Sequence, residues 1–227
     1  VDTGPEPQAV DRCLTDLGIV EVPAVVLTHF HADHVDGLAG VLRGRAVGQV
    51  LVSPVRDPAE GAEDVDRVLT AAGLAARPIR AGDSGQAGAV SWQALWPARR
   101  IDAGSVANNA SVVLDVQSGG LRFLLTGDIE AQAQQALVAM LAGRRFDVVK
   151  TPHHGSANLD EAFVAAAAAP VVLVSVGAGN DYGHPAASAI AAWERLGSLV
   201  VRTDESGDAA VVAVPGAGGG TGVVTRR

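Results

Sequence analysis

The chain has 227 residues, of which 48% are hydrophobic, so one large domain or two small ones can bury a full core without disulfides. The formal net charge is −8, from 25 acidic and 17 basic residues. Because an acidic chain does not attract polyanions by its overall field, this balance disfavours a nucleic-acid substrate unless the arginine pairs 99–100 and 144–145 or bound cations supply positive charge.

Short β-rich runs alternate with alanine-rich amphipathic stretches, which is typical of an α/β domain. Strands are predicted at residues 24–28, 49–53, 90–96, 111–117, 121–126, 147–150, 171–176, 199–202 and 210–214. Helices are predicted near residues 37–42, 65–72, 131–141, 161–168 and 187–196. Glycine-containing turns at 117–120 and 204–208 predict two hairpins. Trp92 and Trp96, at even spacing, are predicted to share one buried face of their strand.

Residues 1–215 are predicted to form one domain without an internal linker, and the glycine-rich residues 216–227 a flexible C-terminal tail. A phosphate-binding glycine loop is the alternative for this tail, but no strand–loop–helix frame surrounds it. The chain starts at Val1 without an initiator methionine or signal peptide, so we expect a fragment or a processed chain. No apolar run approaches the roughly 20 residues that a membrane-spanning helix needs.

All six histidines lie in three short motifs, each of which follows a predicted strand: residues 28–34 (THFHADH), 152–156 (PHHGS) and 182–185 (YGHP). Loops at strand ends are where α/β folds expose functional groups. Neutral imidazole is the commonest metal ligand in proteins. In the first motif, His29 and His31 project from one extended segment, while Asp33 and His34 can supply a second set of ligands from the following turn. The spacing therefore predicts a site for two divalent metal ions.

These motifs carry a family resemblance. Residues 27–37 (LTHFHADHVDG) resemble the signature of the metallo-β-lactamase superfamily, 123–128 (FLLTGD) the strand with its metal-bridging aspartate, and 180–185 (NDYGHP) a late loop with another histidine ligand. Residues 150–156 (KTPHHGS), 1–5 (VDTGP) and 108–114 (NNASVVL) narrow the resemblance to the C-terminal domain of ComEC-type competence proteins. The resemblance covers almost the whole chain.

The resemblance implies an α/β fold, an αββα sandwich of the metallo-β-lactamase type that lacks its first strand or strands, with residues 1–215 as the hydrolase domain. It also implies two divalent metal ions, zinc or manganese. One would be held by Asp33, His34, Asp128 and His184, and the other by His29, His31 and Asp128. A shared Asp128 suits two metals about 3.5–4 Å apart with a bridging hydroxide nucleophile. The alternative role for Asp128 is the N-cap of the helix that follows it.

Two departures from the superfamily pattern stand out. Many members have a further histidine that completes the His29/His31 site, whereas Asn108 and Asn109 stand in that region here. Asparagine is a weak ligand, so the second site is expected to fill only if His153 or His154 substitutes. Asn109 is retained as a candidate supporting residue or substitute ligand. The strand that usually precedes the Asp-Thr-Gly motif is also absent, so we expect an edge of the first sheet to be missing or contributed from upstream.

Asp33, His153 and His154 are the candidate catalytic residues. His153 and His154 are each interpreted as a metal ligand or a general acid, with unequal roles, because one imidazole can face the metals while the other turns to the backbone. A structural pair that caps the next helix is the alternative. Asp2 is expected to orient a ligating histidine, although a plain turn aspartate is the other interpretation. Ser156 is a candidate supporting residue or substitute ligand.

The leading hypothesis is a metal-dependent phosphodiesterase or nuclease, the DNA-degrading domain of a ComEC-like uptake protein, with single-stranded DNA as substrate and a metal-bridging hydroxide as nucleophile. The alternatives are a metallo-hydrolase of a small ester, thioester or lactam, which the charge of −8 favours, and a non-catalytic metal-binding scaffold. The resemblance implies attachment to a membrane-embedded protein, on the extracytoplasmic side of the bacterial cytoplasmic membrane. A stand-alone hydrolase would instead be cytoplasmic.

Overall fold

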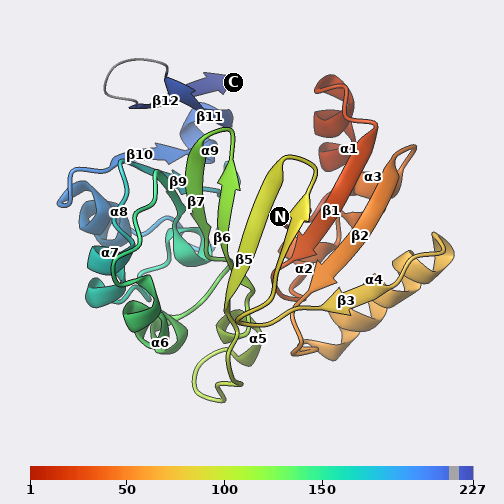
Figure 1. The fold of residues 1–227 in the computed structure, drawn as a ribbon, viewed down its shortest axis with the longest axis horizontal. Helices are drawn as coiled ribbons and strands as arrows, with labels where there is room; N and C mark the ends of the chain where they lie inside the picture. The colour runs from red at the N-terminus through yellow and green to blue at the C-terminus, as the bar shows by residue number, and fades with distance from the viewer. Residues whose placement is uncertain (215–219, 227) are drawn as a thin grey trace.

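The computed structural model describes residues 1–214 and 220–226. Two β-sheets pack face to face, and helices cover the outer side of each sheet (Figure 1). This layering is the expected αββα sandwich. Within the described residues, no helix combines the length and apolar character required to cross a bilayer.

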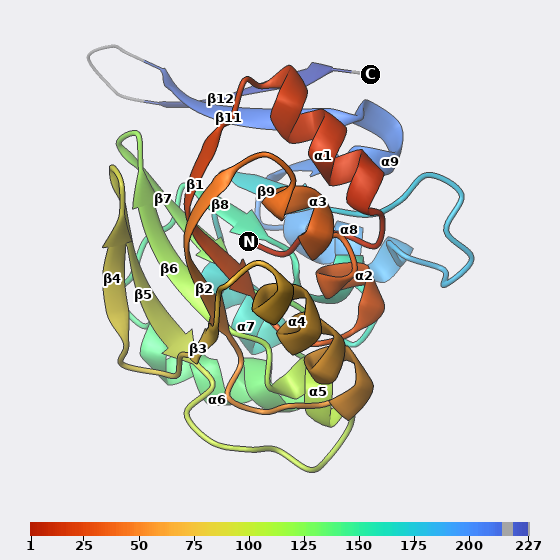
Figure 2. The ribbon, with the colours of Figure 1, turned by 90° about the vertical axis from the view of Figure 1, so that its right-hand side faces the viewer.

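The smaller sheet has three parallel strands in the order β1-β2-β3. Its strands span Glu21–Leu27 (β1), Ala46–Val52 (β2) and Ala76–Pro78 (β3). Three helices cover its outer face: Pro7–Asp16 (α1), Leu38–Leu42 (α3) and Ala59–Ala71 (α4) (Figure 2). Their apolar side chains, such as Val41 and Leu69, bury Val25 and Leu27 of β1. Burial at roughly 25 cal/mol per Å² of apolar surface favours this packing.

The larger sheet has seven strands in the order β10-β9-β8-β7-β6-β5-β4. Its strands span Ser84–Ala87 (β4), Val90–Trp96 (β5), Val113–Ser118 (β6), Leu121–Leu125 (β7), Val148–Lys150 (β8), Val171–Val174 (β9) and Leu199–Arg202 (β10). The helices on its outer face span Ala131–Leu141 (α6), Glu161–Ala167 (α7) and Ala187–Glu194 (α8). Leu137, Phe163 and Trp193 are the large buried side chains of this layer.

Two apolar clusters fill the space over the inner face of the larger sheet. Val26 and Leu51 of the smaller sheet meet Leu114 of the larger one. Farther along, the larger sheet is covered by a hairpin of Asp208–Val214 (β11) and Gly220–Arg226 (β12), whose Val211 and Val223 lie on the inner face. Short helical turns complete the chain: Ala32–Val35 (α2), Val106–Asn109 (α5), Pro152–Gly155 (η1) and Thr203–Ser206 (α9).

The predicted turn at 117–120 is confirmed, because β6 and β7 pair antiparallel with Ser118 opposite Leu121. The predicted hairpin at 204–208 is wrong. The short helix α9 occupies that turn, and β10 pairs with β9 while β11 pairs with β12. Of the predicted C-terminal tail, residues 216–219 and 227 lie outside the described residues. Residues 220–226, however, form the strand β12 rather than a structureless tail.

The arrangement of strands positions the histidine loops. Strands β7, β8 and β9 are parallel neighbours, so the loops after all three emerge at one edge of the larger sheet. The loop after β1 meets this edge through a hydrogen bond from the amide of Val112 to the carbonyl of Thr28, 2.9 Å long. Four loops far apart in sequence therefore converge at one end of the sandwich.

Candidate metal centre

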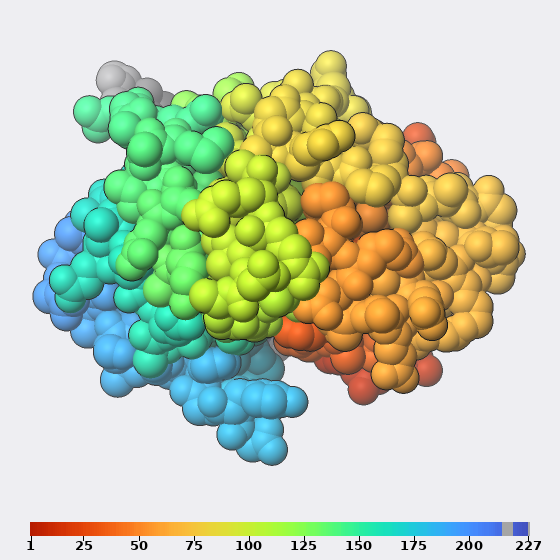
Figure 3. Space-filling model, turned by 90° about the horizontal axis from the view of Figure 1, so that it is seen from below, coloured from red at the N-terminus to blue at the C-terminus, as the bar shows by residue number. Residues whose placement is uncertain are grey.

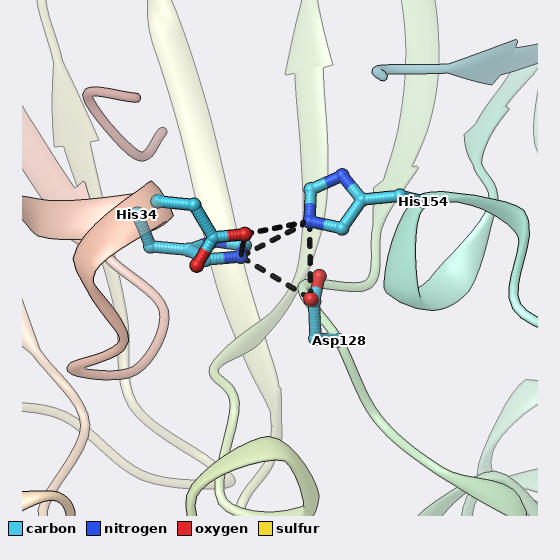
Figure 4. Close-up of side chains that lie close together, drawn as sticks. His34, Asp128 and His154 are labelled. Atoms are coloured by element: carbon cyan, nitrogen blue, oxygen red, sulfur yellow. Dashed lines mark hydrogen bonds and ion pairs between the residues drawn. The ribbon is translucent and has the colours of Figure 1, made fainter. Parts of the chain in front are cut away.

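Four ligand-type side chains converge where these loops meet: Asp33 and His34 from α2, Asp128 after β7 and His154 in η1. One ligand atom from each lies within 4.8 Å of the other three. The Nε2 atoms of His34 and His154 each lie 3.2 Å from Oδ2 of Asp128 and 3.2 Å from each other (Figure 4). Oδ2 of Asp33 lies 3.3 Å from the His154 nitrogen.

Hydrogen bonds behind the cluster orient both imidazoles. Nδ1 of His34 donates to Oδ2 of Asp2 over 2.9 Å, and Nδ1 of His154 donates to the carbonyl of Ser175 over 2.6 Å. Asp2 is itself held by the amide and hydroxyl of Thr28, at 2.7 and 2.9 Å. With Nδ1 engaged in this way, each Nε2 faces the cluster, which is the orientation that metal-ligating histidines adopt.

The charged side chains of the cluster shift one another's pKa values. Burial opposes the charged form of His34, but the carboxylates of Asp2 and Asp128 outweigh it and raise its pKa to about 12. Burial likewise acts against charged His154, while hydrogen bonds to Asp128 and Asp33 raise its pKa to about 9. Burial would raise the pKa of Asp128, yet the neighbouring His34 holds it well below its usual range.

The donor set fits a divalent cation. Without metal, protonated His34 and His154 balance the negative charge of the carboxylates, although the Nε2 atoms of the two rings are only 3.2 Å apart. A divalent ion would supply the same two positive charges in place of the two protons, and it would remove the repulsion between the two imidazolium rings. In addition, Oδ1 of Asp128 is buried and accepts no hydrogen bond from the described residues, because Nζ of Lys150, at 3.7 Å, is too far away to donate one. An unsatisfied buried carboxylate oxygen is costly unless a cation or water meets it.

His29 and His31 lie beside this cluster but are not among its four members. Nε2 of His29 is 3.0 Å from Nδ1 of His31, and the rings of His29 and His34 are 4.1 Å apart between centroids. Burial and the charge of His34 lower the pKa of His29 to about 3, so its imidazole is neutral. Its other nitrogen faces the hydroxyls of Thr28 and Ser111, at 3.1 and 3.3 Å.

His184 was predicted to share a metal with Asp33, His34 and Asp128, and the structure groups it differently. In the four-residue cluster, His154 takes that place. His184 lies instead against His153, with 5.3 Å between ring centroids. Burial lowers the pKa of both His153 and His184, and the buried Nδ1 atom of each lacks a partner within the described chain.

Backbone strain is concentrated at the same place. Asp2, His153 and His154 have φ values of 54°, 47° and 53°, and among described residues they are the only non-glycine residues with positive φ. This left-handed conformation is unfavourable for side chains other than glycine and clusters at functional sites. It also separates the two histidines, because consecutive left-handed residues direct His154 into the cluster and His153 toward His184.

The two asparagines have different surroundings. The side chain of Asn109 is fully engaged: Nδ2 donates to the carbonyl of Ala103 at 2.9 Å, and Oδ1 accepts from the amide of Glu130 at 3.2 Å. Asn108 instead contributes to the lining of a hollow of about 430 Å³ with His31, His153 and His184, and its buried Oδ1 has no partner in the described chain. Asn109 was the predicted substitute ligand, whereas Asn108 is the asparagine that lines the hollow at the site.

Other predicted supporting roles differ as well. Ser156 accepts a hydrogen bond from the amide of Asn158 at 3.2 Å, so it stabilises its own turn. The N-cap of α6 is Glu130 rather than Asp128, and the N-cap of α7 is Asp160 rather than either histidine, so both capping alternatives are wrong.

Positive charge at the site comes from a residue that sequence reasoning did not select. In each of the two arginine pairs that could have supplied this charge, one member is engaged by an aspartate: Arg144 forms an ion pair with Asp115 at 2.5 Å, and Arg100 forms one with Asp102 at 2.7 Å. Lys150, the only lysine of the chain, lies at the end of β8 with Nζ 3.7 Å from Oδ1 of Asp128. The sequence feature that could have drawn attention to Lys150 is that it is the only lysine in a chain whose other basic residues are arginines.

Comparison with known proteins identifies the family of this chain. The sequence model of the metallo-β-lactamase superfamily matches residues 1–178. ComE operon protein 3 of Bacillus subtilis is 30% identical over 200 residues, which cover 86% of this chain and 25% of that protein. Competence protein ComA of Neisseria gonorrhoeae is 32% identical over 102 residues, 44% of this chain and 15% of that one. The chain thus spans about a quarter or less of these relatives.

Solved structures share the fold at low sequence identity. Tm1679, described as a metal-dependent hydrolase of the β-lactamase superfamily, superposes with a TM-score of 0.58 at 15% identity, covering 88% of this chain and 84% of that one. The metallo-β-lactamase fold protein YhfI of Bacillus subtilis gives 0.54 at 13% identity, with 88% and 81% covered. At these identities the likeness establishes the fold alone.

Proposed function

Because the chain belongs to the metallo-β-lactamase superfamily, we propose that it is a metal-dependent phosphodiesterase, the DNA-degrading domain of a ComEC-like DNA-uptake protein. The observation that carries the proposal is the four-residue cluster in a chain related to competence proteins. The competence relatives support attachment to a membrane-associated protein, and as part of the proposal this domain lies on its extracytoplasmic side.

Asp33, His34, Asp128 and His154 would hold one divalent metal ion, zinc or manganese. His29 and His31 would hold a second, with Asp128 shared between the two. When bound, such ions neutralise charge on a substrate phosphate and supply a nucleophilic hydroxide at neutral pH. Asp2 and the Ser175 carbonyl keep His34 and His154 in the ligating orientation.

Side chains of the protein would compensate the remaining negative charge and would donate the proton that the leaving group needs. Lys150 offsets part of the negative charge of Asp128, which it approaches at 3.7 Å. His153, outside the four-residue cluster, is the proposed proton donor to the leaving oxygen. Burial keeps its pKa low in the free protein, and an adjacent substrate phosphate would raise that pKa again. General acid catalysis of this kind typically contributes about 10²–10⁴-fold.

The test is cleavage of end-labelled single-stranded DNA by the purified chain with Mn²⁺ or Zn²⁺, with chelated protein as the reference. Asp128→Asn keeps the side-chain shape but removes the shared charge, so we expect it to abolish metal-dependent cleavage. Asp102→Asn, an exposed aspartate that is not part of the cluster, is the matched control and should cleave normally. Absence of cleavage by wild-type protein that is shown to contain metal would refute the proposal.

A second candidate, hydrolysis of a small ester, thioester or lactam, is favoured by the net charge of −8 and by the size of the hollow at the site, about 430 Å³. A panel of such substrates assayed beside DNA under one metal condition separates the two candidates. The preferred substrate is the one with the higher kcat/KM.

A further inference from the structure

One exposed aromatic residue stands at the rim of the candidate metal centre. Tyr182, the only tyrosine of the chain, is 83% exposed. Its loop joins β9 to α8 and projects from the body of the molecule (light blue in Figure 3). Among the described residues, the other exposed large apolar side chains are aliphatic or methionine. Within the part of the chain that the structure describes, Tyr182 is therefore the only aromatic residue among the exposed large apolar side chains.

The position of this ring relative to the site is specific. Tyr182 lines two adjoining hollows of about 430 and 360 Å³, and Asp33, His154 and His184 line both of them. A group lying on the tyrosine ring would thus share a cavity with two members of the four-residue cluster. Both volumes are in the range of small-ligand pockets, roughly 300–1,000 Å³.

The loop is held in shape around this residue. Nδ2 of Asn180 donates to the carbonyls of Gly177 and His184, at 3.1 and 2.8 Å, which closes the loop across its base. Gly179 and Gly183 flank the tip, both with φ of 77°, a conformation that other residues rarely adopt. The loop therefore presents Tyr182 and His184 together toward the cluster.

We propose that Tyr182 is a specificity-determining residue that stacks on an unpaired base next to the scissile phosphate. This inference rests on the proposed phosphodiesterase function and narrows its substrate to single-stranded polynucleotide, because a base inside a duplex has no free face. Stacking on an aromatic side chain suits a sequence-tolerant enzyme, since every base has a π-face. It also supplies affinity that an acidic chain cannot obtain from its net charge.

The test combines side-chain and substrate changes. Tyr182→Ala should raise KM for single-stranded DNA by about 5- to 100-fold, with a smaller effect on kcat, as expected for loss of one stacked base. Tyr182→Phe keeps the ring and should restore the wild-type KM. Because the side chain is exposed, neither change should alter thermal unfolding, which is measured in parallel.

Oligonucleotides with one abasic sugar, placed at successive positions around the cleavage point, complete the test. Wild-type protein should lose affinity at one position, and Tyr182→Ala should be insensitive there, which is the coupling expected of two groups in contact. Equal abasic penalties in both proteins, or loss of activity in Tyr182→Phe, would overturn the inference while leaving the phosphodiesterase proposal intact. Absence of cleavage by metal-loaded wild-type protein would instead refute the proposed function itself.

Discussion

Asp2 and His34, which are 32 residues apart, are joined by a hydrogen bond of 2.9 Å between Oδ2 and Nδ1. Asp2 has a positive φ of 54°, and its carboxylate is held from the other side by Thr28. Burial would raise the pKa of Asp2, but His34 keeps it below the usual value. The first residues of the chain thus fix the orientation of a histidine in the candidate metal centre.

Replacing Asp2 tests this relationship. Asp2→Asn keeps the side-chain size but removes the charge that holds Nδ1 of His34 protonated. Loss of such a carboxylate partner typically weakens metal binding about 10- to 100-fold. We expect that change in Kd in a chelator competition assay. Asp83→Asn, a charge removal at an aspartate that does not line the site, should leave the Kd unchanged.

Metal affinity should depend on pH with a definite sign. In the metal-free protein, pKa values of about 9 for His154 and about 12 for His34 mean that both imidazoles are protonated at neutral pH. Metal binding requires the unprotonated nitrogen, so it must release protons. Affinity should therefore rise from pH 6 to pH 9, by up to about tenfold per pH unit for each proton released. Calorimetry in two buffers of different ionisation enthalpy counts those protons, and a Kd independent of pH would contradict the expectation.

Replacing His153 should lower activity without lowering stability. Its φ of 47° is unfavourable for histidine and suits glycine, so His153→Gly relieves backbone strain. We expect the melting temperature of the metal-free variant to equal or exceed that of the wild type. We also expect cleavage to fall by about 10²–10⁴-fold if the imidazole donates the proton. A destabilised variant with normal activity would show that His153 is purely structural.

The two adjacent asparagines should behave oppositely. Asn109→Ala leaves the amide of Glu130 without its acceptor and should lower the free energy of unfolding by about 1–3 kcal/mol. Asn108→Ala removes an oxygen that has no partner in the described chain and only one long hydrogen bond, 3.4 Å from Nδ2 to Glu130, so it should change KM or kcat more than stability. Chemical denaturation and steady-state kinetics on both variants distinguish the two roles.

The sequence predicted those strands of the two sheets that carry apolar runs. It missed β3 and β4, because the sequences Ala-Arg-Pro and Ser-Gly-Gln-Ala have no strand preference and these strands depend on pairing with β2 and β5. It also placed Trp92 and Trp96 on one face. A register shift between Ala94 and Trp96 turns Trp96 into the helix-covered layer, while Trp92 stays between the sheets.

At the candidate site, residue types and spacing were enough to select the loops but not the partners within them. Adjacent His153 and His154 are equivalent in sequence, and their left-handed backbone conformation decides which one faces Asp128. The same holds for Asn108 and Asn109: Oδ1 of Asn109 accepts a hydrogen bond from the amide of Glu130, whereas Oδ1 of Asn108, a residue that lines the hollow, has no partner in the described chain. Such assignments depend on tertiary contacts that no local pattern contains.

Lys150 has a practical consequence as the chain's only lysine. Amine-directed reagents have a single side-chain target here, and its nitrogen lies 3.7 Å from the Asp128 carboxylate. The reactivity of one residue therefore reports the electrostatic state of the whole centre. Acylation at this position, followed by peptide mass analysis during a metal titration, would give a chemical footprint of occupancy that needs no substrate.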